Sequence, residues 1–317
     1  MTKGMIIRST GSSYSVRLDD NSIADCHIKG NFRIRGIRST NPVAVGDRVT
    51  IEQQADGTNW IVDIEDRKNY IVRRSTNLSK QSHILAANID LAALIVTINH
   101  PETSLVFIDR FLATAEAYNV TACLIFNKTD LLNEEENVRL QEVRALYEKI
   151  GYRTFSISAK NMSTANGLHK HQALLDYMHN KSVLLSGNSG VGKSTFLNAI
   201  AGKEYARTGE ISTSHNKGMH TTTFSEMYEI TAGNTAIRII DTPGIKGFGT
   251  LDMQKEEVSH YFKDIFQAAK DCRFSNCTHT GEPDCAVVQA VAEGRIATSR
   301  FESYLSILGD IEEEKYR

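Results

Sequence analysis

Short apolar runs separated by turn residues characterise the first 70 residues of the chain. Val45-Gly46-Asp47 and Asp56-Gly57 are typical turn sequences. Each run has the length of a β-strand, and none has a helical period. The runs are residues 5–9, 14–18, 23–28, 48–53 and 59–64. Five short strands joined by turns predict a small β-barrel of the oligonucleotide/oligosaccharide-binding (OB) type.

The hydrophobic pattern changes after a polar stretch at residues 65–88, which we interpret as a connector. Beyond it, apolar runs of strand length alternate with segments of helical period. The strand-like runs are residues 91–98, 120–126, 153–157, 183–185 and 236–240. The helical segments are residues 106–118, 134–149 and 168–179. This alternation predicts βαβ units and a mainly parallel sheet.

Three further helical segments follow, at residues 255–269, 285–293 and 298–315. A chain of 317 residues is too long for one ordinary core. The pattern therefore predicts a multidomain α/β protein. We expect the barrel at residues 1–72, the mainly parallel α/β domain at residues 73–250 and a helical domain at residues 251–317.

Charge is distributed unevenly along the chain, although the formal net charge is only −2. Residues 1–80 contain thirteen Lys/Arg and nine Asp/Glu, whereas residues 251–317 contain eight and thirteen. The basic excess of the barrel is compatible with an RNA-binding face, and it is equally typical of a solvated surface whose aromatics fill the barrel. The residues that would form such a face are Tyr14, Phe32, Arg33, Arg35, Arg38 and Trp60.

No membrane partner is expected from the hydrophobic pattern. The longest apolar run, residues 91–96, is far shorter than the ~20 residues that a membrane span requires. The first residues have no signal-peptide pattern. We therefore expect a cytoplasmic protein.

A glycine-rich stretch follows the apolar run 183–185 and matches the G-x-x-x-x-G-K-[ST] pattern of phosphate-binding loops. Its glycines let backbone N–H groups point at phosphate oxygens. Lys193 is placed to neutralise β- and γ-phosphates, and the Ser194 hydroxyl to bind Mg²⁺. An ordinary glycine turn is the alternative. The predicted nucleotide contacts are Gly187, Asn188, Ser189, Gly190, Val191, Gly192, Lys193, Ser194 and Thr195.

Two other segments indicate a guanine base. The first fits the N-K-x-D pattern, in which the Asp130 carboxylate accepts from N1–H and the exocyclic N2 of guanine. A helix-start aspartate is the alternative for Asp130 alone. The second segment follows the next strand and fits the S-A-K pattern, which donates backbone N–H to guanine O6. The residues assigned to the base are Asn127, Lys128, Asp130, Ser158, Ala159 and Lys160.

Two segments have the features of GTPase switches. After the strand-like run 236–240, Asp241 begins a D-x-x-G pattern, in which it would hold Mg²⁺ through water while the Gly244 N–H senses the γ-phosphate. Residues 218–223 are the expected first switch. There, Thr222 or Thr221 would contact Mg²⁺ and the γ-phosphate.

The residue after the D-x-x-G pattern is Ile245, where Ras-like enzymes carry a glutamine that orients water. Isoleucine cannot do so, which predicts slow intrinsic hydrolysis. His220 is the nearest residue able to position or activate the water, and a solvated loop histidine is the alternative. The predicted catalytic residues are His220, Thr222, Asp241 and Gly244.

All five elements of a GTPase are thus present, but both base motifs precede the phosphate loop. Ordinary GTPases have the phosphate loop first. A circular permutation explains this order, because the termini of a domain commonly lie close together at its surface. The second switch then lies at the end of the GTPase domain, where a movement that depends on the γ-phosphate can pass into the following segment.

A cluster of potential metal ligands lies in the C-terminal segment. Cys272, Cys277, His279 and Cys285 provide three sulfurs and one imidazole within fourteen residues. Four ligands with no open position describe a structural zinc site of Cys₃His type, and unrelated reduced thiols are the alternative. The remaining cysteines, at positions 26 and 123, are expected to be small buried hydrophobes.

The chain resembles, over essentially its whole length, the circularly permuted GTPases of bacteria that depend on the small ribosomal subunit, often called the RsgA or YjeQ family. The resemblance rests on the motifs above and on Gly46-Asp47-Arg48-Val49. It implies an OB-type barrel, a permuted GTPase domain and a zinc domain. Met219 departs from the family pattern, because members commonly have a basic residue there.

The resemblance also implies a function in late maturation of the small (30S) ribosomal subunit. GTP hydrolysis would be stimulated by the subunit and coupled to release of the protein from it and its 16S rRNA. We expect a monomer that uses GTP/GDP, Mg²⁺ and one structural Zn²⁺. The alternative is a GTP-gated RNA-binding or translation-regulating module with incidental hydrolysis. A metabolic kinase is disfavoured by the guanine motif.

Overall fold

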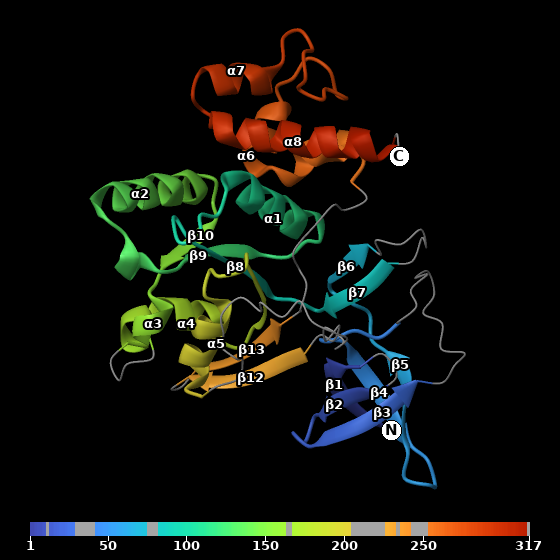
Figure 1. The fold of residues 1–317 in the computed structure, drawn as a ribbon. Helices are drawn as coiled ribbons and strands as arrows, with labels where there is room; N and C mark the ends of the chain where they lie inside the picture. Colours follow the sequence, from blue (N-terminus) through green and yellow to red (C-terminus); the bar gives the residue numbers. More distant parts are fainter. Residues whose placement is uncertain are drawn as a thin grey trace, which may run out of the picture. The chain divides into compact units, whose positions relative to one another are not determined.

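The structure is a computed structural model, drawn as a ribbon in Figure 1. Its chain divides into two compact units. The structure describes residues 1–10, 13–28, 42–74, 82–162, 167–203, 226–232, 235–241 and 253–315. The first unit comprises Met1–Ala93, Ala159–Ser186 and Lys193–Lys246, and the second comprises Leu94–Ser158, Gly187–Gly192 and Gly247–Arg317.

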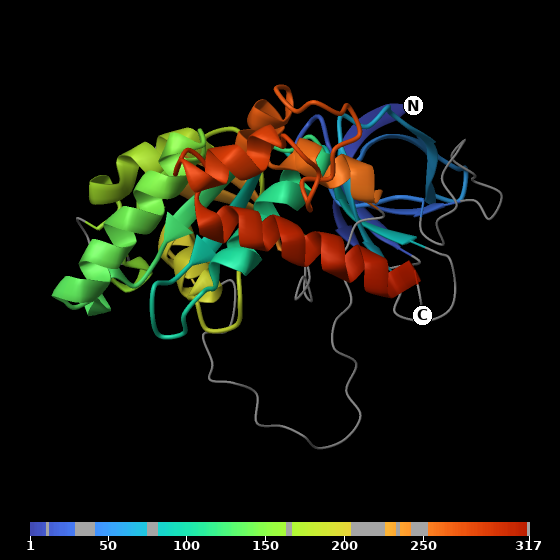
Figure 2. The same cartoon turned by 90° about the horizontal axis from the view of Figure 1, so that it is seen from above.

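The predicted five-stranded barrel forms the N-terminal part of the first unit. Its strands are β1 (Thr2–Ser9), β2 (Tyr14–Leu18), β3 (Ile23–Ile28), β4 (Arg48–Gln53) and β5 (Asn59–Ile64). They lie in the order β1-β2-β3-β5-β4, and the antiparallel pairing of β1 with β4 closes the barrel (Figure 2). Alternate residues such as Val16, Val49 and Ile61 are fully buried, as expected when one face of each strand lines an interior.

Two of the aromatic residues considered for an RNA-binding face differ in how far they are exposed to solvent. Tyr14 is fully buried, so it fills the barrel interior. Trp60 is half-buried, and its ring lies 5.9 Å from the ring of His27. The other candidates, Phe32, Arg33, Arg35 and Arg38, lie outside the described residues.

The Gly46-Asp47 turn has a structural role at the edge of the barrel. Gly46 has a φ of 93°, and a Cβ atom there would lie 2.1 Å from the carbonyl oxygen of Ala87. Asp47 is fully buried and accepts two hydrogen bonds from the Arg67 guanidinium, both at 2.7 Å. A buried bidentate pair of this kind fixes geometry. These two residues therefore join the barrel to the segment that follows it.

The interpretation of residues 65–88 as a polar connector is wrong for most of the segment. β6 (Tyr70–Arg74) and β7 (Ser82–Ala87) form an antiparallel two-stranded ribbon. Val45 forms a bridge with Ala86 of this ribbon, which keeps the ribbon next to the barrel.

Three further strands extend the sheet of the first unit beyond β1. β11 (Ser182–Ser186) runs parallel to β13 (Thr235–Asp241), and β12 (Glu226–Ala232) runs antiparallel to β13. β12 also pairs with β1 of the barrel through Arg8 and Glu226. The strand β12 was absent from the predicted pattern. The unit also contains α3 (Ala159–Met162), η2 (His169–His171), α4 (Gln172–Met178) and α5 (Lys193–Ala201).

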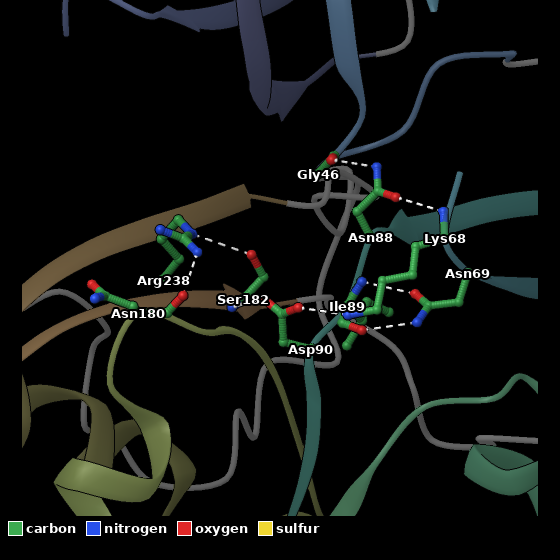
Figure 3. Close-up of polar contacts among 9 residues, drawn as sticks. All are labelled: Gly46, Lys68, Asn69, Asn88, Ile89, Asp90, Asn180, Ser182 and Arg238. Carbon is green, nitrogen blue, oxygen red and sulfur yellow. Dashed lines mark hydrogen bonds and ion pairs between the residues drawn. The ribbon is translucent and has the colours of Figure 1, made fainter. Parts of the chain in front are cut away.

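Polar side chains tie the barrel to the turn that precedes β8 (Figure 3). The Asn88 amide donates to the Gly46 carbonyl at 3.0 Å and accepts from the Lys68 N–H at 2.9 Å. Next to it, the buried amide of Asn69 donates to the Ile89 carbonyl at 2.9 Å and accepts from its N–H at 2.8 Å. The backbone of this turn is therefore held from both sides.

Asp90 connects the same turn to the first residue of β11. Its carboxylate accepts from the Ser182 N–H and from the Lys68 ammonium, both at 2.9 Å (Figure 3). Burial raises the pKa of Asp90, but these hydrogen bonds outweigh burial and hold its pKa below the ordinary value. Arg238 of β13 donates to the Ser182 hydroxyl at 3.2 Å. One polar cluster thus joins the barrel side of the unit to β11 and β13.

We expect Asp90→Ala to lower the free energy of unfolding by about 1–2 kcal/mol at pH 7, because the Ser182 N–H loses its charged acceptor. Because the pKa of Asp90 is lower in the folded state than its ordinary value of 3.8, the ionised carboxylate stabilises the folded state at pH values above 3.8. This stabilisation is lost as the pH falls through the folded-state pKa. Urea unfolding should show that the free energies of unfolding of Asp90→Ala and the wild type become more similar below about pH 4.

The matched control is Lys68→Ala. The Lys68 side chain is 63% exposed, so losing its ion pair should change stability by at most ~0.5 kcal/mol. A difference between the wild type and Asp90→Ala that stays the same from pH 7 to pH 3 would contradict the role given to the carboxylate.

The second unit contains a parallel sheet and the helices that follow its strands. β10 (Arg153–Ser156) pairs in parallel with β9 (Ala122–Phe126), and β8 (Leu91–Val96) is the next strand in the order. α1 (Leu105–Ala117) and α2 (Glu134–Lys149) follow β8 and β9. The Asn133 and Glu136 side chains form a capping box at the start of α2.

The C-terminal helices pack on α1 of the same unit (Figures 1 and 2). They are η3 (Lys255–Tyr261), α6 (Lys263–Ala269), α7 (Ala286–Ala292) and α8 (Thr298–Lys315). Ala113 of α1 lies in one apolar cluster with Phe262, Val287 and Tyr304. The apolar core of the C-terminal segment therefore includes Ala113 of α1, a helix of the α/β part of the chain. Among the described helices, none combines the length and apolar character that crossing a membrane requires.

A buried ion-pair network joins α8 to α1. Arg300 is 1% exposed and donates to Asp109 at 2.7 Å and to Asp264 at 2.8 Å. The Tyr147 hydroxyl donates to the same Asp109 oxygen at 2.7 Å. Burial raises the pKa of Asp109, and the Arg300 guanidinium opposes this. Such a network stabilises one arrangement of the helices only while all its partners are present.

Candidate functional site

The predicted base motif lies at the carboxyl end of β9 and contacts the phosphate loop. Asn127 is 3% exposed, and its Nδ2 donates to the Val191 carbonyl at 2.8 Å. Its own N–H donates to the Val96 carbonyl at 2.9 Å, so the end of β8 holds its backbone. The structure thus brings together two motifs that are 64 residues apart in the chain.

Two glycines of the phosphate loop are required by this close approach. Gly192 has a φ of 96°, and a Cβ atom there would lie 2.4 Å from Asn127 Nδ2. Gly187 has a φ of 147°, and its Cβ would lie 2.5 Å from the carbonyl oxygen of Ile95. Side chains at these positions would push the loop away from the strands that support it.

The two base motifs are also joined to each other. The N–H and the hydroxyl of Thr129 both donate to the Ile157 carbonyl, at 3.2 and 3.0 Å. Asp130 is exposed within the short helix η1 (Thr129–Leu131). Ser158 is 7% exposed and directly follows Ile157. The next two predicted residues, Ala159 and Lys160, begin α3, the first buried and the second exposed.

Of the remaining predicted nucleotide residues, Lys128, Asn188, Ser189 and Gly190 lie in the second unit. The others lie in the first unit or outside the described residues. Lys193, Ser194 and Thr195 are the first residues of α5. Asp241 is the last residue of β13. The predicted switch residues His220, Thr221, Thr222 and Gly244, and the atypical Met219, lie outside the described residues.

Cys272, Cys277, His279 and Cys285 form one cluster, in which the four ligand atoms all lie within 4.8 Å of one another. The Cys272 and Cys285 sulfurs are 3.9 Å apart, and His279 Nδ1 lies 3.7 and 3.4 Å from them. Bonds to tetrahedral zinc of about 2.3 Å for sulfur and 2.0 Å for nitrogen imply ligand separations of about 3.8 and 3.5 Å. The donor set and its spacing therefore fit Zn²⁺.

Glu282 organises the loop of this cluster, which the sequence pattern did not reveal. Its carboxylate accepts from the N–H of Thr278 at 2.6 Å and of Thr280 at 2.8 Å. Burial raises the pKa of Glu282, but these hydrogen bonds outweigh burial and lower its pKa to about 2. A carboxylate that is ionised at neutral pH thus closes the turn that presents His279. In the sequence, the only indication of this role is the position of Glu282 between the two ligands His279 and Cys285.

The two remaining cysteines are separate from the metal cluster, as predicted. Cys26 and Cys123 are both fully buried in strands, β3 and β9. Burial raises the pKa of the Cys26 thiol to about 11. A thiol that stays protonated at neutral pH behaves as a small apolar side chain.

A base motif that precedes the phosphate loop in the chain, and contacts it, defines a circularly permuted GTPase, here with an OB-type barrel before it and a Cys₃His cluster after it. The family model described as RsgA GTPase matches residues 64–251, and that of the RsgA N-terminal domain matches residues 3–61. The chain belongs to the RsgA GTPase family.

Curated relatives match the chain over its whole length. "Small ribosomal subunit biogenesis GTPase RsgA 2" of Bacteroides thetaiotaomicron is 56% identical over 99% of each chain. "Small ribosomal subunit biogenesis GTPase RsgA" of Phocaeicola vulgatus is 57% identical over the same shares. These identities extend through the barrel, the GTPase part and the C-terminal helices.

Solved structures show the same fold. YjeQ from Thermotoga maritima is 30% identical, with a TM-score of 0.75 and coverage of 98% of both chains. YloQ, whose structure is described as that of a circularly permuted GTPase, is 25% identical, with a TM-score of 0.74, and the match covers 100% of this chain and 97% of YloQ.

Proposed function

We propose that this protein is a GTP hydrolase that acts in biogenesis of the small ribosomal subunit. The observation that carries the proposal is the 2.8 Å hydrogen bond from Asn127 to the Val191 carbonyl. It joins a guanine motif to a phosphate loop in a chain that is 56–57% identical to small-subunit biogenesis GTPases over 99% of its length.

The nucleotide site combines two kinds of recognition. Asp130 accepts from the guanine edge, and adenine lacks the matching pair of donors. Backbone N–H groups of the phosphate loop and the N-terminus of α5 bind the phosphates, with Lys193 as the counter-charge. The backbone around Ala159 donates to guanine O6.

Mg²⁺ binding and hydrolysis depend on the switch residues. Ser194 and Thr222 bind Mg²⁺, Asp241 holds it through water, and Gly244 senses the γ-phosphate. His220 is the proposed group that positions the attacking water. Since Ile245 cannot orient that water, contact with the subunit completes the site and makes hydrolysis fast.

The parts of the chain that flank the GTPase domain attach the protein to the small ribosomal subunit. The barrel, residues 1–72, and the C-terminal residues 251–317 contact 16S rRNA, and GTP hydrolysis in residues 73–250 releases the protein. Zn²⁺ bound by Cys272, Cys277, His279 and Cys285 holds the C-terminal loops. We propose that the protein acts as a monomer in the cytoplasm.

The proposal is tested by measuring GTP turnover with and without purified small ribosomal subunits. We expect a rise of about tenfold or more, equal to a fall of about 1.4 kcal/mol in the barrier. Large subunits are the control, and they should have no such effect. If turnover does not rise while RNA binding depends on GTP, the protein is instead a GTP-gated RNA-binding module.

A further inference from the structure

A loop closed by two threonines, residues Thr97–Thr103, connects β8 to α1. Thr97 and Thr103 are buried, 1% and 6% exposed. The Thr97 N–H donates to Thr103 Oγ1 at 3.1 Å, and the Thr103 N–H donates to the Thr97 carbonyl at 2.9 Å. The Thr97 hydroxyl donates to the Pro101 carbonyl inside the loop. These bonds give the loop a single closed shape.

One side of this loop contacts the base motif. The Lys128 ammonium donates to the His100 carbonyl at 2.5 Å. Lys128 and His100 both have a φ of 62°, in the left-handed region. Each such residue costs about 1–3 kcal/mol, and such strain gathers at functional sites. This hydrogen bond places the Lys128 ammonium against the loop.

The other side of the loop contacts the phosphate loop. Gly190 has a φ of 82°, and a Cβ atom there would lie 3.4 Å from Pro101 Cδ and 3.7 Å from Cγ. A Cβ at this position would make ordinary van der Waals contact, so the proline ring lies beside Gly190, which stays exposed. The threonine-closed loop is therefore hydrogen-bonded to the base motif and adjacent to the phosphate loop of the proposed nucleotide site.

The outer end of the loop is anchored as well. Asn99 Nδ2 donates to Glu136 Oε1 at 2.5 Å, and the hydrogen bond from Asn99 lowers the pKa of Glu136. Glu136 belongs to the capping box of α2. The loop is thus held by α2, by Lys128 and by its own threonines.

We propose that the threonine-closed loop is a positioning element for the guanine nucleotide, and that Thr97 and Thr103 set how long GDP or GTP stays bound. The proposal rests on the function proposed above. The threonines act through other residues: they fix the His100 carbonyl, which holds Lys128, and the Pro101 ring, which lies beside Gly190. Loosening the loop releases both halves of the site together.

The test is the rate of release of a fluorescent GDP from the full-length protein carrying Thr103→Val. Valine keeps the shape of threonine but removes the acceptor of the buried Thr97 N–H. We expect release to become about five- to tenfold faster, the effect of one lost buried hydrogen bond. Thr103→Ser, which keeps the hydroxyl, should restore most of the wild-type rate.

Ser104→Ala is the matched control for a loss of stability alone. The Ser104 hydroxyl caps α1 by accepting from the Phe107 N–H at 3.3 Å, and it makes none of the bonds within the threonine-closed loop. Its removal destabilises the helix start by a comparable amount. GDP release should therefore stay at the wild-type rate in Ser104→Ala.

A double-mutant cycle with Lys128→Ala separates positioning from general loosening. If the loop acts through Lys128, Thr103→Val should add little to the effect of Lys128→Ala. Full additivity, or a wild-type release rate in Thr103→Val, overturns this proposal alone. A wild-type protein that binds no guanine nucleotide overturns the proposed function, and this proposal with it.

Discussion

Lys193→Ala should abolish nucleotide retention, with GTP and GDP affinity falling by about 10²–10⁴-fold, or about 3–5 kcal/mol. Lys193 is the first residue of α5 and directly follows Gly192 of the phosphate loop. Without its ammonium, phosphate charge is met by Mg²⁺, by backbone N–H groups and by the helix dipole, the last worth about 0.3–1 kcal/mol at exposed sites. Titration with a fluorescent GDP measures the loss.

Lys181→Ala is the matched control, because Lys181 precedes β11 and Lys193 follows the loop at the other end of that strand. The Lys181 ammonium lies 4.0 Å from the centre of the Tyr177 ring. This control should bind as the wild type does. Lys193→Arg should bind weakly, since the charge remains but the planar guanidinium has a different shape. Wild-type affinity in Lys193→Ala would remove the phosphate-loop assignment.

Where local signals agreed, the sequence predicted elements to the residue. The segments predicted at 134–149 and 298–315 are the helices α2 (Glu134–Lys149) and α8 (Thr298–Lys315). The start of α2 has a capping box, so the local sequence and the fold favour the same boundary there. The five barrel strands were found for a similar reason, since each is bounded by turn residues.

The missed strands are those whose own hydrophobic signal is weak, so that pairing with neighbouring strands decides their conformation. In β12 the buried residues Met227 and Ile230 are three residues apart rather than two, and a glutamate directly precedes each of them, so the segment lacks the regular alternation of a strand. Its pairing with β13 and β1 decides that it is a strand. β6 and β7 likewise become strands by pairing with each other.

For the site, motifs identified the residues but not how they contact one another. The G-x-x-x-x-G-K-[ST] pattern explains glycine at position 192 by phosphate access, whereas the structure adds Asn127 Nδ2 at 2.4 Å from any Cβ there. Thr97 and Thr103 belong to no motif. Their reciprocal hydrogen bonds form because the loop from β8 to α1 folds back on itself. Composition and motif spacing do not show this geometry.

Cys277→Ser should release Zn²⁺ and unfold the C-terminal helices. α6 and α7 have only seven residues each, well below the ~12–15 at which an isolated helix is even marginally stable. Zinc binding supplies about 10–16 kcal/mol in small zinc domains, as much as the whole stability of an ordinary domain. The loss of one thiolate ligand is therefore enough to unfold this segment. Zinc content and helical circular dichroism should fall together.

Cys26→Ser is the matched control, because Cys26 is fully buried in the barrel and lies outside the metal cluster. This variant should keep its zinc and its C-terminal helices, although a buried hydroxyl costs about 1–3 kcal/mol in the barrel. Removing zinc from the wild type with a chelator should reproduce the Cys277→Ser spectrum. If Cys277→Ser keeps the wild-type helix content and thermal transition, the zinc assignment is wrong, and packing on α1 alone holds these helices.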